Sequence, residues 1–274
     1  MQKWQRWSCS LAAMLAAVVV LLRGSSLAAP GAAEKVRRLP IVDRAIAYHG
    51  GDRYRASETH LTIRSRSGAF RITVRTDGEK FEHMVMDALP DGRERKTRVT
   101  NDRVERWEGA AQVTLDAAGE RRARDFVQGR IYFPFLPFRL NDASVWKEDL
   151  GLEEWEGRKL HKVKITFDAG TSTDASDEYL YWFEPDTGHL VQYAYSFGTG
   201  TAQGGLRLRK NFHERRVGGI LFADSENLGV DGPGNLRVAL ITPEYAKSKL
   251  QKISTVTLED IKVQPIGPQA GAGK

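Results

Sequence analysis

The sequence predicts a mainly β protein (α+β), built on one strongly curved antiparallel sheet with two helices. Three observations indicate this fold class. Alternating apolar and polar residues, typical of strands with one face in a core, recur from residue 61 to residue 263. Turn pairs such as Ser67-Gly68, Asp77-Gly78 and Asp91-Gly92 separate the early strands. Only two segments change to helical spacing, so the pattern is an antiparallel meander and not a βαβ alternation.

The first 28 residues have the layout of a secretory signal peptide. Lys3 and Arg6 begin the segment, the apolar run Leu11–Leu22 follows, and small residues surround Ala28. The run is shorter than the about 20 residues that a membrane-spanning helix needs. We therefore expect cleavage near Ala28 and a periplasmic protein. A retained N-terminal membrane anchor is the alternative, because Arg23 ends the apolar run abruptly.

Composition and charge exclude several classes of protein. Residues are 41% hydrophobic and 28% charged, as in ordinary globular domains. Cys9, the single cysteine, would leave with the signal, so the mature chain has no thiol for a disulfide or a cysteine-built zinc site. Removing residues 1–28 lowers the net charge from +6 to +3. The remaining basic groups, Arg93–Lys96 and Glu120–Arg122, contain acids and indicate solvated faces, not a nucleic-acid surface.

One folded domain is expected within the mature chain. Residues 29–35 form an Ala/Gly-rich lead that we expect to be flexible, and residues 36–264 form the domain. Residues 265–274 are rich in Gly, Pro and Ala and are expected to be a disordered tail.

The domain begins with a helix over residues 40–49. Pro40 suits the first helical position, and Gly50-Gly51 suits the left-handed C-cap. Five strands are expected after it, over residues 61–63, 70–75, 81–86, 104–107 and 112–115.

A second amphipathic helix is expected over residues 120–132, where Ala123, Phe126, Val127 and Ile131 fall at helical spacing. It leads into Tyr132–Phe138, which holds four aromatic residues and two prolines. Because proline disfavours a helix interior or a central strand, these rings must be buried from a loop. Two interpretations stay open: the loop plugs the open end of the core, or it forms an apolar lip over a ligand cavity.

The second half of the domain repeats the strand pattern more strongly. Strands are expected over residues 161–167, 178–183, 190–197, 206–212, 216–224 and 256–263, about ten in the whole domain. The strand at 178–183 is apolar on both faces, so both of its faces must be covered. Such a sheet must close, or be filled by its helices, to protect its inner face.

Catalytic signatures are absent from the sequence. There is no G-x-S-x-G, H-E-x-x-H or Walker motif, and the six histidines include no helical metal-binding pair. A metal or hydrolase site would require His60 and His83 to converge on an acid such as Asp87. We therefore expect no enzyme activity, catalytic residue, metal or cofactor, and an exported hydrolase is the first alternative.

Three segments carry a resemblance to a known family: Ala45–Gly51, Phe135–Leu140, and Asp177–Tyr179 with the following Thr187-Gly188. Together they resemble an uncharacterised family of bacterial exported proteins related to the outer-membrane lipoprotein-sorting carriers LolA and LolB. The resemblance implies an unclosed antiparallel β-barrel of about eleven strands, with helices covering the open inner face. It also implies an apolar cavity, which in the carriers holds the acyl chains of lipoproteins.

The sequence and the resemblance together favour a carrier-like periplasmic protein that binds a lipid, a lipoprotein acyl chain or another apolar ligand in the half-barrel. Its expected partners are a lipid or an acylated protein, with transient contacts to the membrane or to envelope proteins and none to nucleic acid. A structural or partner-binding envelope protein with a filled core is the second alternative. The candidate cavity residues are Phe70, Phe81, Phe126, Phe133, Phe135, Phe138, Tyr181, Trp182 and Tyr193, with Arg71 and Arg139 as polar candidates.

Overall fold

The computed structural model describes residues 34–170 and 176–266. The predicted signal peptide lies outside the described residues, as do residues 29–33 of the predicted lead and residues 267–274 of the predicted tail. None of the helices in the described part combines the length and the apolar character needed to span a bilayer.

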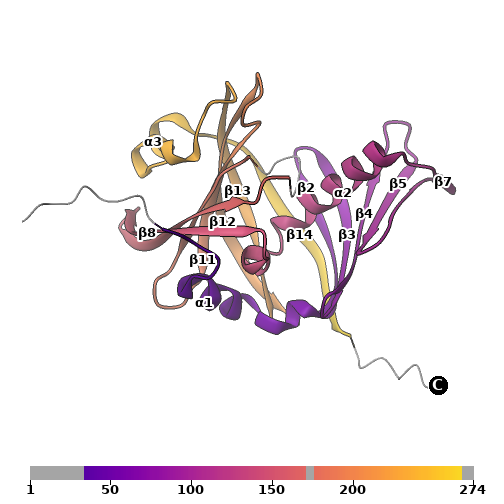
Figure 1. Cartoon of the computed structure of the whole chain (residues 1–274), viewed down its shortest axis with the longest axis horizontal. Helices are drawn as coiled ribbons and strands as arrows, with labels where there is room; N and C mark the ends of the chain where they lie inside the picture. Colours follow the sequence, from indigo (N-terminus) through magenta and orange to yellow (C-terminus); the bar gives the residue numbers. More distant parts are fainter. Residues whose placement is uncertain (1–33, 171–175, 267–274) are drawn as a thin grey trace, which may run out of the picture. The chain divides into compact units, whose positions relative to one another are not determined.

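A single antiparallel sheet contains all the strands of the described residues (Figure 1). They are β1 (Lys35–Val36), β2 (Ala56–Ser65), β3 (Gly68–Asp77), β4 (Lys80–Ala88), β5 (Glu94–Thr100), β6 (Val104–Glu108), β7 (Ala111–Val113), β8 (Val145–Trp155), β9 (Arg158–Phe167), β10 (Tyr179–Phe183), β11 (Leu190–Phe197), β12 (Gly204–Val217), β13 (Ile220–Gly232) and β14 (Gln251–Pro265). Their spatial order is β1-β8-β9-β10-β11-β12-β13-β14-β2-β3-β4-β5-β6-β7. Because β1 and β7 end this order without pairing to each other, the sheet is open, and the predicted unclosed β-barrel is confirmed.

Three α-helices and three 3-10 turns complete the described domain: α1 (Pro40–His49), α2 (Ala117–Tyr132), α3 (Pro243–Lys249), η1 (Gly51–Arg55), η2 (Phe138–Asn141) and η3 (Val238–Leu240). The first helix has the predicted bounds. The second begins three residues earlier than expected, because the Asp116 carboxylate accepts a hydrogen bond from the Gly119 amide at 2.6 Å and caps it. The third helix was not predicted.

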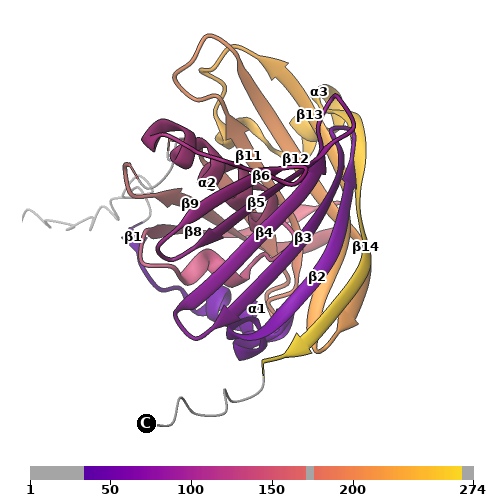
Figure 2. The ribbon, with the colours of Figure 1, turned by 90° about the vertical axis from the view of Figure 1, so that its right-hand side faces the viewer.

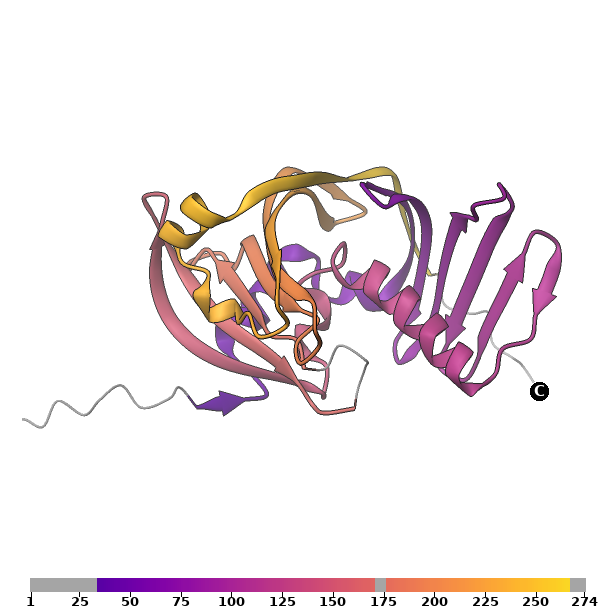
Figure 3. The same ribbon diagram turned by 90° about the horizontal axis from the view of Figure 1, so that it is seen from above.

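One half of the sheet, β2 to β5, buries only its inner face. Its side chains alternate, so Leu61, Ile72 and Val85 enter a core while their neighbours point outward. Helix α2 lies against β4, β5 and β6 and adds Val127 and Ile131 to that core (Figures 2 and 3). This half therefore has two layers, a sheet and one helix.

The other half, β8 to β12, is covered on both faces at its central strand β10. All five residues of β10 are buried. Tyr181 and Phe183 pack with α1 and the segment before β8, whereas Leu180 and Trp182 pack on the opposite face with η3 and α3. The prediction that both faces of this strand are covered is confirmed, and the unpredicted α3 is part of the outer cover.

The two halves are continuous through β14, which pairs with β13 along its first residues and with β2 along its last. A register shift between Glu259 and Lys262 lies within its β2-paired part. The strands on either side of this junction form the walls of a cavity.

Candidate functional site

A cavity of about 250 Å³ lies at the junction of the two halves. Strands β11 to β14 form one side, β2 and β3 the other, and the loop after α2 adds a third wall. Apolar and polar groups contribute to its lining in similar measure: His49, Ile63, Ser65, Ser67, Phe70, Gly129, Arg130, Phe133, Pro134, Leu136, Leu190, Tyr193, Tyr195, Arg209, Asn211, Glu214, Leu221, Ala223, Ser225, Val256 and Leu258. Concave sites that combine apolar walls with polar groups are typical of small-molecule binding.

The aromatic loop after α2 takes both of the roles that the sequence left open. Phe133 lines the cavity and stacks on the rings of Tyr193 and Tyr195, with centroids 5.5 and 5.1 Å away. Phe135 instead enters the core and meets Phe222 edge-on at 5.9 Å, while Phe138 stacks on Tyr54 at 4.5 Å. The prolines prevent a regular helix or strand, so successive rings point to different neighbours.

The other predicted cavity residues divide between the cavity and the cores. Phe70, Phe133 and Tyr193 line the cavity. Phe81, Phe126, Phe135 and Phe138 pack in or against the core under α2. Tyr181 is buried under α1, where its hydroxyl and that of Tyr132 are 2.8 Å apart, and Trp182 lies on the outer face of β10.

The two predicted polar candidates lie outside the cavity lining. Arg71 is on the outward face of β3 and pairs with Glu94. Arg139 is held by Asp142 at 2.7 Å and by Gln128 at 2.6 Å. The arginines that line the cavity are Arg130 at the end of α2 and Arg209 on β12. Alternation along β12 could have indicated Arg209, because Leu206 and Leu208 face the other way.

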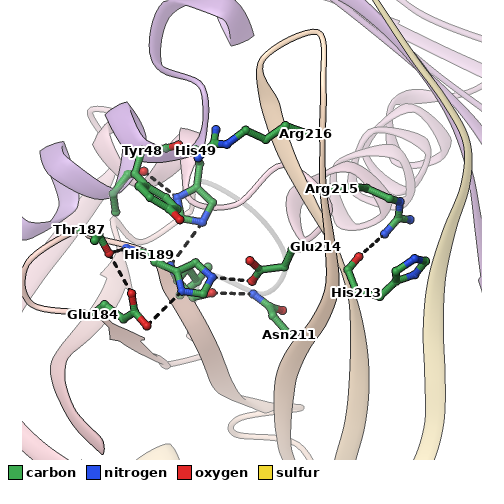
Figure 4. A network of polar contacts seen from close by, with 12 residues as sticks. Tyr48, His49, Glu184, Thr187, His189, Asn211, His213, Glu214, Arg215 and Arg216 are labelled. Atoms are coloured by element: carbon green, nitrogen blue, oxygen red, sulfur yellow. Dashed lines mark hydrogen bonds and ion pairs between the residues drawn. The ribbon is translucent and has the colours of Figure 1, made fainter.

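A network of polar groups borders the cavity beside α1 (Figure 4). His49 Nδ1 donates to the Ala45 carbonyl at 2.8 Å, and the Leu190 amide donates to Nε2 at 3.4 Å. Both ring nitrogens of His49 are therefore engaged in its neutral form. Burial lowers the pKa of His49 to about 4, so the ring stays neutral at neutral pH.

The neighbouring His189 has the opposite electrostatic character. Its ring stacks on His49 with centroids 6.0 Å apart, and its Nε2 donates to Glu214 at 2.5 Å. Burial alone would lower the pKa of His189, but the hydrogen bond and the charge of Glu214 raise it. Burial likewise opposes ionisation of Glu214, yet the bond to His189 holds the pKa of Glu214 below its usual range. In this pair each partner therefore favours the charged form of the other, beside a neutral imidazole.

A glycine turn determines the close approach of the two imidazoles. Gly188, with φ 76°, ends the turn after β10, and a Cβ there would lie 2.6 Å from the Ala45 backbone nitrogen of α1. Only glycine allows this conformation and this contact, which place His189 beside the last turn of the helix.

The hydrolase alternative depended on His60 and His83 sharing a carboxylate, and that arrangement is not formed. The two side chains lie on opposite faces of the sheet. His60 contacts Glu58 at 2.8 Å on the outer face, whereas His83 is buried and its Nδ1 has no partner in the described part of the chain. Within residues 34–170 and 176–266, no three His, Cys, Asp or Glu side chains are grouped to hold a metal ion.

Comparison with known proteins gives a family and a set of similar folds. The model of a family of unknown function (DUF6503) matches residues 20–257. No curated protein matches the sequence.

Several solved structures resemble the described domain. A LolA superfamily protein from Nitrosomonas europaea is 11% identical, with a TM-score of 0.49, and the match covers 83% of this chain and 94% of that protein. A DUF1329 family protein from Desulfovibrio piger is 11% identical, with a TM-score of 0.42 and coverages of 81% and 91%. Lipoprotein LppX of Mycobacterium tuberculosis is 16% identical, with a TM-score of 0.29 and coverages of 62% and 93%. The resemblance to the LolA superfamily is the one that the sequence indicates.

Proposed function

The chain belongs to the DUF6503 family of unknown function, and we propose that it is an exported, carrier-like protein that binds a lipid or another apolar molecule in the cavity between β11–β14 and β2–β3. The export part of the proposal rests on the signal-like residues 1–28. A lipoprotein acyl chain is one such ligand, and its donor would be a transient partner.

The observation that carries the proposal is the cavity itself. A sheet open between β1 and β7 could have been filled at its junction by larger side chains, but Ala223 and Ser225 of β13 line a cavity of about 250 Å³ there. Around them Ile63, Leu221 and Leu258 present apolar surface. An acyl chain placed there would gain about 0.8 kcal/mol for each methylene removed from water.

The same geometry favours binding over catalysis. His49 is the histidine of the cavity lining, and its two ring nitrogens are engaged by Ala45 and Leu190. It therefore has no free nitrogen to accept a proton from a lining serine, as a general base must. Glu214 is held by His189. We infer a non-enzymatic role.

The proposal is tested by native mass spectrometry of the mature protein purified from its own envelope, followed by uptake of a fluorescent fatty acid. We expect extra mass that organic extraction removes as lipid, and uptake by the extracted protein. Ala223→Phe should abolish uptake, because the ring fills the cavity. Met84→Phe, which adds a ring on the outward face of β4, should bind normally.

Circular dichroism and melting temperature would show that both variants fold. A bare mature mass combined with no uptake would contradict the proposal and favour an envelope protein with a structural role. Unchanged uptake by a folded Ala223→Phe variant would place the ligand elsewhere.

A further inference from the structure

We propose that the cavity ligand is an amphiphile with one apolar chain and one anionic head group, and that Arg209 binds the head group. The inference rests on the proposed function and names its ligand class. It starts from the charges of the cavity lining, which are two arginines and one glutamate.

Arg209 is the cavity arginine with a buried hydrogen-bond donor that has no partner among the described residues. Its Nη1 lies 3.4 Å from the Ser225 hydroxyl oxygen, and its Nε is buried with no partner among the described residues. No carboxylate of the described part forms an ion pair with it. By contrast Arg207, two residues earlier on the same face of β12, donates to Asp231 at 2.6 Å. A guanidinium is suited to carboxylate and phosphate oxygens, which accept two parallel N–H bonds.

Arg130 adds a second positive charge to the same lining. Its guanidinium carbon lies 4.5 Å from the ring centroid of Phe70 and 4.9 Å from that of Phe126. Asp87 is the carboxylate whose charge favours the protonated form of Arg130. Asp87 is already held by Arg95 through hydrogen bonds of 3.0 and 2.6 Å. Arg130 therefore contributes positive potential to the cavity and has no carboxylate of its own in the described part.

The lining glutamate does not neutralise these charges. Glu214 forms its 2.5 Å bond with His189, and His49 beside it is neutral. Because Glu214 is engaged by His189 and the lining holds two arginines against one glutamate, Arg130 and Arg209 leave the cavity with an excess of positive charge among its described groups. An apolar molecule without an anion would leave the Nε of Arg209 unsatisfied, which is unfavourable because this nitrogen is buried.

The size of the cavity indicates one chain. Ligand cavities usually range from about 300 to 1,000 Å³, and about 250 Å³ lies just below that range. Phe133 stacks on both Tyr193 and Tyr195, and its ring centroid lies 5.9 Å from the guanidinium carbon of Arg209, so aromatic rings occupy the side next to Arg209. One acyl chain fits these dimensions better than two or three side by side.

The test compares four probes with the extracted full mature protein: dodecanoate, dodecyl phosphate, dodecanol and didodecyl phosphate, each displacing a fluorescent fatty acid. We expect each single-chain anion to bind at least about tenfold more tightly than dodecanol, a difference of about 1.4 kcal/mol. Didodecyl phosphate should bind more weakly than dodecyl phosphate. The tighter of the two single-chain anions identifies a carboxylate or a phosphate head group.

Arg209→Met should remove this preference and keep the affinity for dodecanol, because the apolar walls remain. Arg130→Met should reduce the preference by a smaller factor, and Arg71→Met, on the outer face, should leave it unchanged. Equal binding of dodecanol and dodecanoate by the wild type would overturn the anionic head group but not the carrier. A full preference in folded Arg209→Met would overturn the role of Arg209, and binding of none of the probes would contradict the proposed function itself.

Discussion

The outer faces of the two halves of the sheet differ in the side chains they carry and in what covers them. On β10 and β12 the apolar outer-face residues Leu180, Trp182 and Leu208 are covered by η3 and α3. On β2 to β5 the outer face is charged, and Arg98 bridges Glu82 and Glu105 at 2.9 and 3.3 Å. One half is a three-layer structure and the other a two-layer structure.

This difference shows how the residue pattern of a strand reports the number of layers around it. Phe70–Val74 alternates because only one face of β3 is covered, whereas Tyr179–Phe183 is apolar throughout because both faces of β10 are. The cavity lies where one arrangement changes to the other, so its lining mixes aromatic, aliphatic and charged groups. An amphiphilic ligand would match that mixture.

The largest expected effect comes from exchanging an outer-face tryptophan in each half. Trp182 is fully buried, meets Trp155 edge-on at 5.1 Å and donates to Glu153 at 2.6 Å. Trp182→Ala should lower the free energy of unfolding by about 3–5 kcal/mol, because a large cavity forms under α3. Trp107 is half-buried on the outer face of β6 with Lys96 above its ring, and Trp107→Ala should cost less than about 1 kcal/mol.

Urea unfolding followed by circular dichroism measures both changes. Trp182→Phe serves as the variant that keeps most of the buried ring, and it should lose clearly less stability than Trp182→Ala. Similar losses for Trp182→Ala and Trp107→Ala would contradict the distinction between a three-layer and a two-layer half.

Much of this architecture follows from local patterns, and the unpredicted parts have physical reasons. Strands are predicted from the sequence wherever β-branched or aromatic residues alternate with polar ones. This prediction misses β5, whose segment Glu94–Thr100 has Val99 as its one large aliphatic residue, and β1, which has two residues. It misses β8 because Asp149–Leu152 interrupts the alternation with a register shift. Helix α3 has seven residues, too few for a periodic pattern.

The cavity was harder to predict than the fold. Selecting aromatic residues finds Phe70, Phe133 and Tyr193 of the cavity. The same criterion also selects rings that pack in the cores, so it does not separate the two groups. Arg209 depends on the pairing of β11, β12 and β13, which places Tyr193 opposite Arg209 and brings Ser225 near. His189 and Glu214 are 25 residues apart and meet across strands. Such contacts depend on register, which one sequence does not define.

A smaller effect should distinguish the buried histidine of each half through pH. Burial lowers the pKa of His49 to about 4 and that of His83 to about 3, below the about 6.5 of an unfolded histidine. Unfolded chains therefore bind protons more readily, so stability should fall as pH decreases from about 6.5 towards 4. Protonation linked to each histidine should lower the free energy of unfolding by on the order of 3 kcal/mol over the full range. Unfolding midpoints in urea measured from pH 7.5 to 4 show the loss.

The two histidines should respond differently to substitution. His83→Leu removes a ring whose Nδ1 has no partner in the described residues, so it should change stability little at pH 7 and reduce the acid sensitivity. His49→Leu leaves the Leu190 amide unpaired and should cost about 1–3 kcal/mol at pH 7. His60→Gln, on the solvated outer face, is the control and should preserve the acid response. If both Leu variants lost as much stability at low pH as the wild type, the acid response would not come from these two histidines.

The smallest expected effect comes from the ion pairs of the solvated outer face. The Glu58 carboxylate accepts from Arg75 at 3.0 Å and contacts His60 at 2.8 Å, but water reaches all three side chains. Glu58→Gln should lower stability by less than about 1 kcal/mol, and 1 M salt should remove most of the difference, because exposed pairs are screened. A loss of several kcal/mol that persists in high salt would mean that this face is covered by something in the folded protein, and the contrast with the face under α3 would then disappear.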